Sequence, residues 1–130
     1  MKSVVKGVSL PLVALVSLAA MLVVSPSAAA ATSNGVAITG RFDLFQNNGF
    51  SGGMRSFTSN LTEFNGQKWN NGQSMQNSAS SMENHSDSFV GMWDNGTACT
   101  GANYIAQPFS VDSTFGNNNF DNRASCLKFI

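Results

Sequence analysis

The chain has 130 residues, and its seven lysines and arginines balance seven acidic residues, so the formal net charge is +0. This length suits one domain with a single modest core. The sequence has no basic patch of the kind that nucleic-acid binding requires, and we expect no nucleic-acid partner. Ten phenylalanines and two tryptophans, spread among Asn, Ser and Gly residues, indicate short strands joined by turns, and a disordered chain is not expected.

The N-terminal segment has the features of an export signal. Lys2 and Lys6 precede an almost continuously apolar run over 8–24, and small alanine-rich residues follow. A transmembrane anchor is the alternative, but the run is marginal in length for a bilayer span and no basic flank follows it. We predict a signal peptide over residues 1–31 and a secreted, extracellular domain over 32–130, with no membrane partner after cleavage.

Beyond this segment the pattern is typical of short strands, without helical periodicity. Clusters of Asn and Gly, which favour turns, separate runs of alternating or apolar residues. Several short strands with such punctuation predict an all-β sandwich or barrel. The expected strands are Ile38–Gln46, Arg55–Thr58, Ser80–Asn84, Ser88–Trp93, Asn103–Gln107 and Ser125–Ile130.

The two halves of this domain repeat one unit. The first half reads F-Q-N-N-G-F-S-G-G from Phe45, and the second reads W-D-N-G-T-A-C-T-G from Trp93. Each half closes on a short polar box, Q-N-S-A-S-S from Gln76 and D-N-R-A-S-C from Asp121. The duplication predicts two copies of one supersecondary unit that pack together.

Each copy places a hairpin and a glycine after its aromatic residue. Gly52 and Gly101 are expected where only glycine takes the backbone angle easily and where a ring lies close. The serine near the end of the unit is expected to bond its hydroxyl to the backbone of the folded hairpin. The residues that specify the fold in this way are Phe45, Phe50, Gly52, Ser81, Trp93 and Gly101.

Cys99 and Cys126 are the two cysteines of the chain. In an exported protein such a pair is most simply a disulfide, which the chain-entropy model values at roughly 3–4 kcal/mol for a loop of this length. A reactive thiol pair or a metal site is the alternative. Neither C-x-x-C spacing nor a neighbouring histidine supports that alternative.

These motifs resemble the Greek-key motif of the βγ-crystallins, which is aromatic-x4-aromatic-x-Gly followed by an (N/D)-(N/D)-x-x-(S/T)-S box. Phe45 to Gly52 matches the first part. Trp93 to Gly101 is one residue longer and has a cysteine in place of the second aromatic residue. With the export signal, the stretches S-S-M-E-N and D-N-R-A-S are similar to an exported bacterial group of this type, peptidase inhibitor family thirty-six, whose founding type is a metalloproteinase inhibitor.

The resemblance implies a monomeric double Greek-key sandwich, in which two four-stranded units, about 37–86 and 87–130, pack as a wedge about a pseudo-twofold axis. In each key the fourth strand returns beside the first. The Cys99–Cys126 link would then tie the folded hairpin of the second unit to its closing strand. A shared aromatic core is expected from Phe42, Phe45, Phe57, Phe89, Trp93 and Phe129.

No motif for catalysis is present, and we expect no catalytic residue and no enzyme. The single histidine, His85, fits a solvated turn residue, and no spacing brings two of the acidic residues together on one element. The resemblance implies instead that the protein inhibits an extracellular protease through a rigid exposed loop, which loses little entropy on binding. The loop itself stays unidentified, with Asn60–Met75 and Pro108–Asn119 as the longest connections.

Calcium binding is the alternative function, and we expect no cofactor to be required, with Ca²⁺ as the one candidate. The resemblance implies that oxygen atoms of the two boxes surround Ca²⁺ in a structural or stress protein. The candidate ligands are Asp121, Asn122, the Arg123 carbonyl and Ser125 in one box, and Asn77, the Ser78 carbonyl and Ser80 in the other, where Gln76 replaces an Asn or Asp. One charged ligand and a nearby arginine predict weak binding. Boxes that only stabilise turns, and a secreted adhesive module, are the remaining interpretations.

Overall fold

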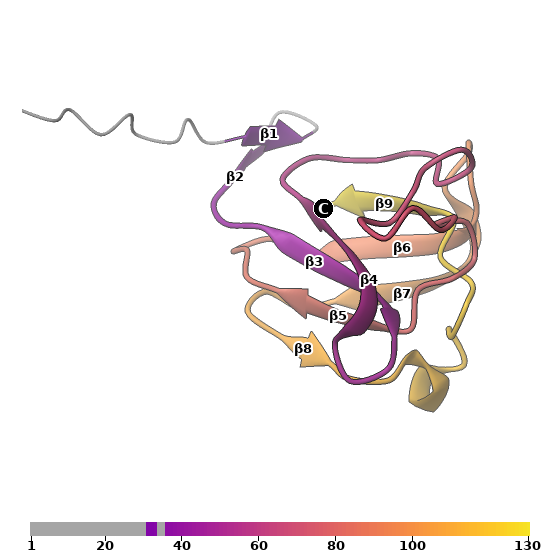
Figure 1. The fold of residues 1–130 in the computed structure, drawn as a ribbon. Helices are drawn as coiled ribbons and strands as arrows, with labels where there is room; N and C mark the ends of the chain where they lie inside the picture. Colours follow the sequence, from indigo (N-terminus) through magenta and orange to yellow (C-terminus); the bar gives the residue numbers. More distant parts are fainter. Residues whose placement is uncertain (1–30, 34–35) are drawn as a thin grey trace, which may run out of the picture.

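The computed structural model describes residues 31–33 and 36–130, which form strands β1 to β9 and one short 3₁₀ helix (Figure 1). The predicted signal peptide lies outside the described residues, apart from Ala31 at the start of β1. Within the described part, no helix has the length and apolar character needed to cross a bilayer. The prediction of an all-β fold is confirmed.

The first sheet has the strand order β4-β3-β5-β8, with every neighbouring pair antiparallel. Its strands are β3 (Phe42–Asn47), β4 (Ser51–Phe57), β5 (Ser81–Asn84) and β8 (Val111–Asp112). The sequence predicted β5 closely, began β3 four residues too early at Ile38, and placed β4 only from residue 55. Its glycine-rich start has low strand propensity, and pairing with β3 overrides that preference.

The second sheet has the order β7-β6-β9 and is also antiparallel. It comprises β6 (Val90–Asn95), β7 (Thr100–Ala106) and β9 (Cys126–Phe129). Beyond β9, Leu61 pairs with Leu127 through two backbone hydrogen bonds of 3.0 and 2.8 Å. The sheet is therefore extended at this edge by a segment from the first repeat.

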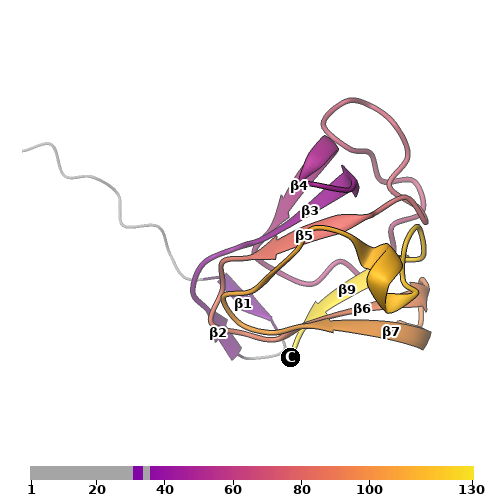
Figure 2. The same cartoon turned by 90° about the horizontal axis from the view of Figure 1, so that it is seen from below.

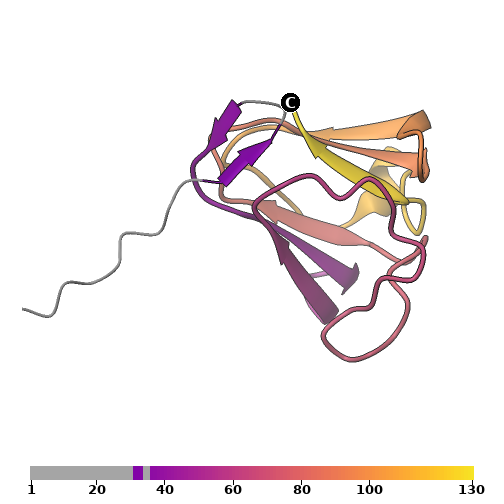
Figure 3. The same ribbon diagram turned by 90° about the horizontal axis from the view of Figure 1, so that it is seen from above.

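Three elements lie outside the two sheets. A small hairpin is formed by β1 (Ala31–Ser33) and β2 (Val36–Ile38), and the 3₁₀ helix η1 covers Phe115–Asn118. The two sheets converge near this hairpin and diverge toward the opposite end, as two views show (Figures 2 and 3). The result is a wedge, with its core between the sheets.

The third strand of each repeat pairs with a strand in the sheet of the other repeat. β8 follows the second hairpin in the chain but pairs with β5, through Met82–Asp112 and Glu83–Val111. Leu61 occupies the corresponding place after the first hairpin and pairs with β9. The fourth strand does return beside the first, with β5 next to β3 and β9 next to β6. The two Greek keys are thus interlocked.

The predicted core is right in part. Phe42, Phe57 and Phe129 are buried in the main hydrophobic cluster. Phe89 is 46% exposed, which contradicts the prediction, because it precedes β6 at the rim of the sandwich. Trp93 is only half-buried and lies across Gly91, where an added Cβ would come within 2.3 Å of the ring.

The long connections add several large side chains to the core. The sequence analysis expected an exposed loop among them, yet single large side chains from these connections belong to the main hydrophobic cluster. Phe115 and Phe120 pack edge-on at 6.1 Å between ring centroids, and both contact the Tyr104 ring. The buried residues from these connections are Phe64, Trp69, Met75, Phe115 and Phe120.

The two hairpins fold back as predicted. Gly52 and Gly101 have φ angles of 76° and 89°, in the left-handed region that glycine tolerates best. The expectation of a ring beside them is wrong, because an added Cβ would first meet the side chain of Asn47 or of Asp94. Rings lie instead over two other glycines. Trp69 covers Gly53, one residue after Gly52, and Trp93 covers Gly91, which lies on β6, the strand beside Gly101.

A disulfide joins Cys99 and Cys126, as predicted, with the two Cα atoms 5.7 Å apart. It connects the second hairpin to β9. Phe50 and Ser81 hold the corresponding positions of the first repeat, where a hydrogen bond of 3.1 Å runs from the Phe50 amide to the Ser81 hydroxyl. The second repeat therefore has a disulfide at the position where the first repeat has a hydrogen bond.

Candidate metal centre between the two repeats

The two polar boxes, 76–81 and 121–126, lie against each other although they are far apart in the chain. The Asn77 amide donates to the Ala124 carbonyl at 3.1 Å, and the Asn122 amide donates to the Ala79 carbonyl at 3.0 Å. These four residues hold equivalent positions in the two repeats, so the contact has local twofold symmetry. The boxes therefore form one joint site.

The conformation of each box depends on its asparagine. Asn77 and Asn122 have φ angles of 50° and 56°, which place both in the left-handed region. Asparagine enters this region more readily than most residues because its short amide can bond locally. The side chain of Asn122 does so with Asp121, at 3.0 Å. The asparagine at the second position of each predicted box thus has a conformational role, and its side-chain oxygen is also available as a ligand.

Ser125 joins the two boxes through its side chain. Its hydroxyl is buried, donates to Asn77 Oδ1 at 2.6 Å and accepts from Gln76 Nε2 at 2.9 Å. The same hydroxyl lies 3.4 Å from the carbonyl oxygen of Arg123. The structure therefore brings together four of the predicted box residues, two from each repeat.

Other predicted ligands are placed differently. The hydroxyl of Ser78 donates to the Ser74 carbonyl at 2.7 Å and accepts from the Trp69 indole at 2.9 Å, so only its carbonyl is left for a ligand role. Ser80 is buried, and its backbone bonds Phe45 and Phe115. The site is therefore less symmetric in its side chains than in its backbone.

Two oxygen atoms of the site are buried without a hydrogen-bond partner among the described residues. They are Gln76 Oε1 and Asp121 Oδ1, at the first position of each box. Leaving a buried acceptor unpaired costs about 1–3 kcal/mol, and more when the group is charged. Because buried polar groups in proteins are nearly always paired, two such atoms at equivalent positions require a partner.

The arginine of the second box is neutralised locally. The Arg123 guanidinium donates to Asp94 at 2.6 Å and to the Asn119 carbonyl at 3.1 Å. From the sequence, the positive charge of Arg123 near the box was expected to weaken calcium binding. Its ion pair with Asp94 reduces the repulsion that a second cation would meet.

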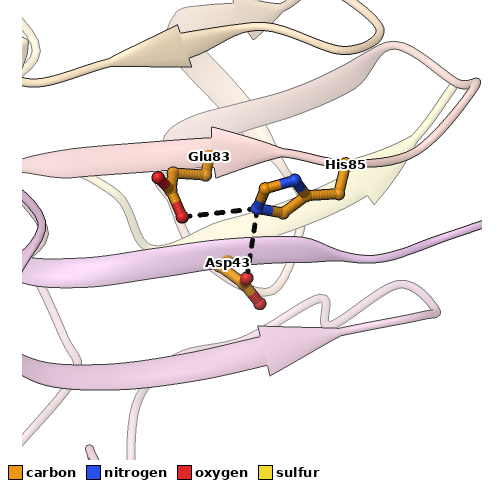
Figure 4. A group of neighbouring side chains, drawn as sticks. All are labelled: Asp43, Glu83 and His85. Atoms are coloured by element: carbon orange, nitrogen blue, oxygen red, sulfur yellow. Dashed lines mark hydrogen bonds and ion pairs between the residues drawn. The ribbon is translucent and has the colours of Figure 1, made fainter.

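Sequence reasoning missed a second group of metal-ligating side chains, formed by Asp43, Glu83 and His85 (Figure 4). The acidic residues appeared scattered, and His85 was expected to be a solvated turn residue. Asp43 and Glu83 are paired directly across β3 and β5. The signal that would have found them is the register between these two strands, which no local pattern reveals.

No family model and no curated protein matches the chain. Among solved structures, one described as "Evolution of the eye lens beta-gamma-crystallin domain fold" is 14% identical, with a TM-score of 0.62, and the match covers 70% of this chain and 85% of that one.

A βγ-crystallin from Ciona intestinalis is 17% identical with a TM-score of 0.59, over 70% of this chain and all (100%) of that one. A βγ-crystallin from an archaeon is 16% identical with a TM-score of 0.55, over 69% of this chain and 96% of that one. At such low identities the likeness establishes the fold alone, and none of these three points to a peptidase inhibitor. The chain has a βγ-crystallin-like fold.

Proposed function

We propose that the protein binds Ca²⁺ where the two boxes meet, and that the ion stabilises the double Greek key. The observation that carries this proposal is the pair of buried, unpartnered oxygen atoms, Gln76 Oε1 and Asp121 Oδ1. A hard cation that takes several oxygen ligands is a suitable partner for buried oxygens of this kind. A box that served only to stabilise turns would leave them without a partner.

The residues that would hold the ion come from both repeats. The Asp121 carboxylate supplies the negative charge, and neutral oxygens come from Gln76 Oε1, Asn77, Ser125 and the Arg123 carbonyl. Ca²⁺ supplies charge compensation and a link between the repeats, with no chemical reaction. A site with one carboxylate belongs to the weak class, with a dissociation constant on the order of 10⁻⁴–10⁻³ M.

Terbium luminescence tests the location of this site. Tb³⁺ replaces Ca²⁺ and is sensitised by a nearby indole, and Trp69 contacts box residue Ser78. We expect luminescence that Ca²⁺ displaces and that Trp69→Phe reduces. Luminescence that Ca²⁺ leaves unchanged would contradict the proposal.

Calorimetric titration with Ca²⁺ supplies the matching thermodynamic test. We expect Asp121→Asn and Ser125→Ala to weaken binding at least tenfold, while Glu83→Gln, which removes a carboxylate from the outer face of the first sheet, leaves it unchanged. At a concentration 100 times the dissociation constant, Ca²⁺ should stabilise the wild-type protein by about 2.7 kcal/mol. A thermal melt that is indifferent to Ca²⁺ would exclude the stabilising role.

Protease inhibition is the second candidate function, and one loop favours it. Phe109 is 73% exposed at the tip of the loop before β8. The loop is braced, because the Asn84 amide donates to the Ser110 carbonyl at 2.7 Å and the Asn84 side chain donates to the Gln107 carbonyl at 2.8 Å. A rigid loop with an exposed aromatic side chain loses little entropy when a protease cleft binds it.

The test is the residual activity of a thermolysin-like metalloprotease and of subtilisin, each incubated with the purified protein with and without Ca²⁺. Inhibition predicts a saturable, dose-dependent loss of one activity, which Phe109→Ala reduces. Phe89→Ala is the matched control, because Phe89 is also an exposed phenylalanine, at 46%. Full activity of both proteases beside the intact protein would exclude the inhibitor function for these classes and leave the calcium proposal standing.

A further inference from the structure

Three potential metal ligands converge on the outer face of the first sheet, away from the polar boxes. Asp43 of β3 and Glu83 of β5 are directly opposite in the strand register, and His85 follows two residues later on the same face. Their side chains point toward one another (Figure 4). One ligand atom from each residue lies within 4.8 Å of the other two.

The distances between these atoms fit a shared ion. His85 Nε2 lies 3.3 Å from Glu83 Oε2 and 3.5 Å from Asp43 Oδ2. In a tetrahedral site with Zn–N and Zn–O bonds of about 2.0–2.1 Å, neighbouring ligand atoms lie about 3.3–3.4 Å apart. A charge-assisted hydrogen bond between the same groups would instead bring them to about 2.7–2.9 Å.

The ligands are held in place by surrounding groups. The side chain of Asp43 is 2% exposed, and its Oδ1 accepts a hydrogen bond of 2.5 Å from Ser56. The Arg41 Nε–H donates to both oxygens of Asp43, at 3.1 and 2.8 Å. A neutral donor such as Ser56 orients a ligand in this way. The Arg41 guanidinium differs, because its positive charge competes with a bound cation.

The backbone of His85 is fixed as well. Its amide donates to the Arg41 carbonyl at 2.8 Å. On the other side, Gly40 at φ 97° packs so tightly that a Cβ there would lie 2.1 Å from the His85 carbonyl oxygen. The next turn is held by the buried side chain of Asn84, which accepts from the Ser86 amide at 3.0 Å and donates to the Ser88 carbonyl at 2.9 Å. The imidazole therefore projects from a well-supported strand end.

The negative charge of the Asp43 and Glu83 carboxylates favours the binding of a cation. Two carboxylates directly opposite on neighbouring strands repel each other. Arg41 compensates one of them, which leaves one net negative charge when His85 is neutral. Glu83 and His85 keep side-chain exposures of 29% and 43%, so an ion can enter from solvent.

We propose that Asp43, Glu83 and His85 form a binding site for Zn²⁺, with solvent as the fourth ligand. The mixed nitrogen and oxygen set favours a borderline ion such as Zn²⁺, because Ca²⁺ prefers oxygen ligands alone. The ion links β3 to β5 and removes the repulsion between their carboxylates. This site does not depend on the calcium proposal.

The test is a calorimetric Zn²⁺ titration of the purified protein without a histidine tag, at saturating Ca²⁺. We expect one saturable site. His85→Ala should weaken binding at least tenfold, since it removes one of three ligands, and Asp121→Asn in the polar box should leave binding unchanged. His85 is exposed, so its substitution should leave the fold intact, which circular dichroism checks.

Two further variants separate the proposal from a simple ion-pair cluster. Arg41→Gln should strengthen Zn²⁺ binding several-fold, because it removes a competing cation, whereas loss of a merely structural arginine would not. Asp43→Asn should abolish binding. If Asp43→Asn fails to fold, Glu83→Gln serves in its place, because Glu83 is more exposed.

The imidazole itself gives an independent readout. His85 is the only histidine of the chain, so its ring ¹⁵N resonances report this site alone. Zn²⁺ should shift Nε2, the nitrogen that faces the carboxylates, more than Nδ1. No saturable binding, wild-type affinity in His85→Ala, weaker binding in Arg41→Gln or an unshifted Nε2 would each overturn the proposal.

Discussion

The hydroxyl of Ser81 fixes the first hairpin by accepting a hydrogen bond from the Phe50 amide at 3.1 Å. The same hydroxyl donates to the Asn47 carbonyl at 2.6 Å, so it spans the two ends of the folded turn. Ser81 is fully buried, and Phe50 is held at a φ of 58°. The side chain thus stabilises a backbone conformation that a phenylalanine rarely adopts.

Ser81→Ala is expected to lower the free energy of unfolding by about 1–3 kcal/mol, because the Phe50 amide and the Asn47 carbonyl lose their partner. Urea denaturation measures the change. Ser59→Ala is the control, since Ser59 is exposed and makes no side-chain hydrogen bond within the described residues. Equal stability of the two variants would show that the hairpin is held by its strand pairing alone.

Reduction of the Cys99–Cys126 disulfide is expected to destabilise the protein by roughly 3–4 kcal/mol in the chain-entropy model, given the sequence separation of 27 residues. Urea denaturation with and without reductant measures this difference. The double variant Cys99→Ala/Cys126→Ala should unfold identically in both conditions. If reductant left the free energy of unfolding of the wild-type protein unchanged, the expectation would be contradicted.

Tyr104 makes stability fall in alkaline solution. Burial, followed by the hydrogen bond to Asp112 and the negative charge of that carboxylate, raises the pKa of Tyr104 above the ordinary value of 10.0. The folded state therefore keeps the phenol proton at a pH where the unfolded chain releases it. The contribution of Tyr104 to stability is complete below about pH 10 and declines as the pH rises further.

Absorbance of the phenolate checks this directly, because Tyr104 is the only tyrosine of the chain. The folded protein should ionise at higher pH than the protein in urea. The free energy of unfolding of Tyr104→Phe should decline less above pH 10 than that of the wild type. Coincident titrations of the folded and unfolded states would refute the shift.

A carboxylate in the weaker box should improve calcium binding. Gln76→Glu replaces a neutral oxygen beside Asn77 and Ser125 with a charged one, and calcium affinity rises with ligand charge. We expect at least tenfold tighter binding by calorimetry and a larger melting shift with Ca²⁺. Without Ca²⁺ the variant should be less stable than the wild type, because Ser125 loses the hydrogen bond donated by Gln76.

The charge-matched control for this variant is Gln73→Glu, at an exposed residue of the preceding connection. It adds the same charge outside the box and should leave calcium affinity within about twofold, since the Coulomb interaction between exposed charges is weak in water. If both variants tighten binding alike, the effect is one of net charge and the box has no part in it.

The repeated motifs made much of the fold predictable. Aromatic residue, hairpin, glycine and box lie within short distances in the sequence and occur twice, so their comparison predicted the Ser81 bond and the positive φ of Gly52 and Gly101. The disulfide was predicted separately, from the pair of cysteines in an exported chain. Local chemistry decides each of these features. The predicted box residues also meet in space, as a duplicated fold with twofold symmetry requires.

Features that depend on pairing between distant segments were not predictable. β8 has only two residues, and no pattern in the sequence marks it as a strand. It is a strand because it pairs with β5. Phe64 and Phe115 lie in segments rich in Asn and Gly, and only the closed sandwich explains their burial. The cluster of Asp43, Glu83 and His85 likewise exists only through the β3–β5 register.

The exchange of third strands between the repeats has a consequence for their independence. A repeat expressed alone would lack the strand that covers one edge of its sheet, and β5 would be left with free backbone groups beside it. Unpaired edges recruit strands from other molecules. Two copies of a single repeat could complete each other's sheets, so the chain behaves as a symmetric dimer whose two subunits have been joined into one polypeptide.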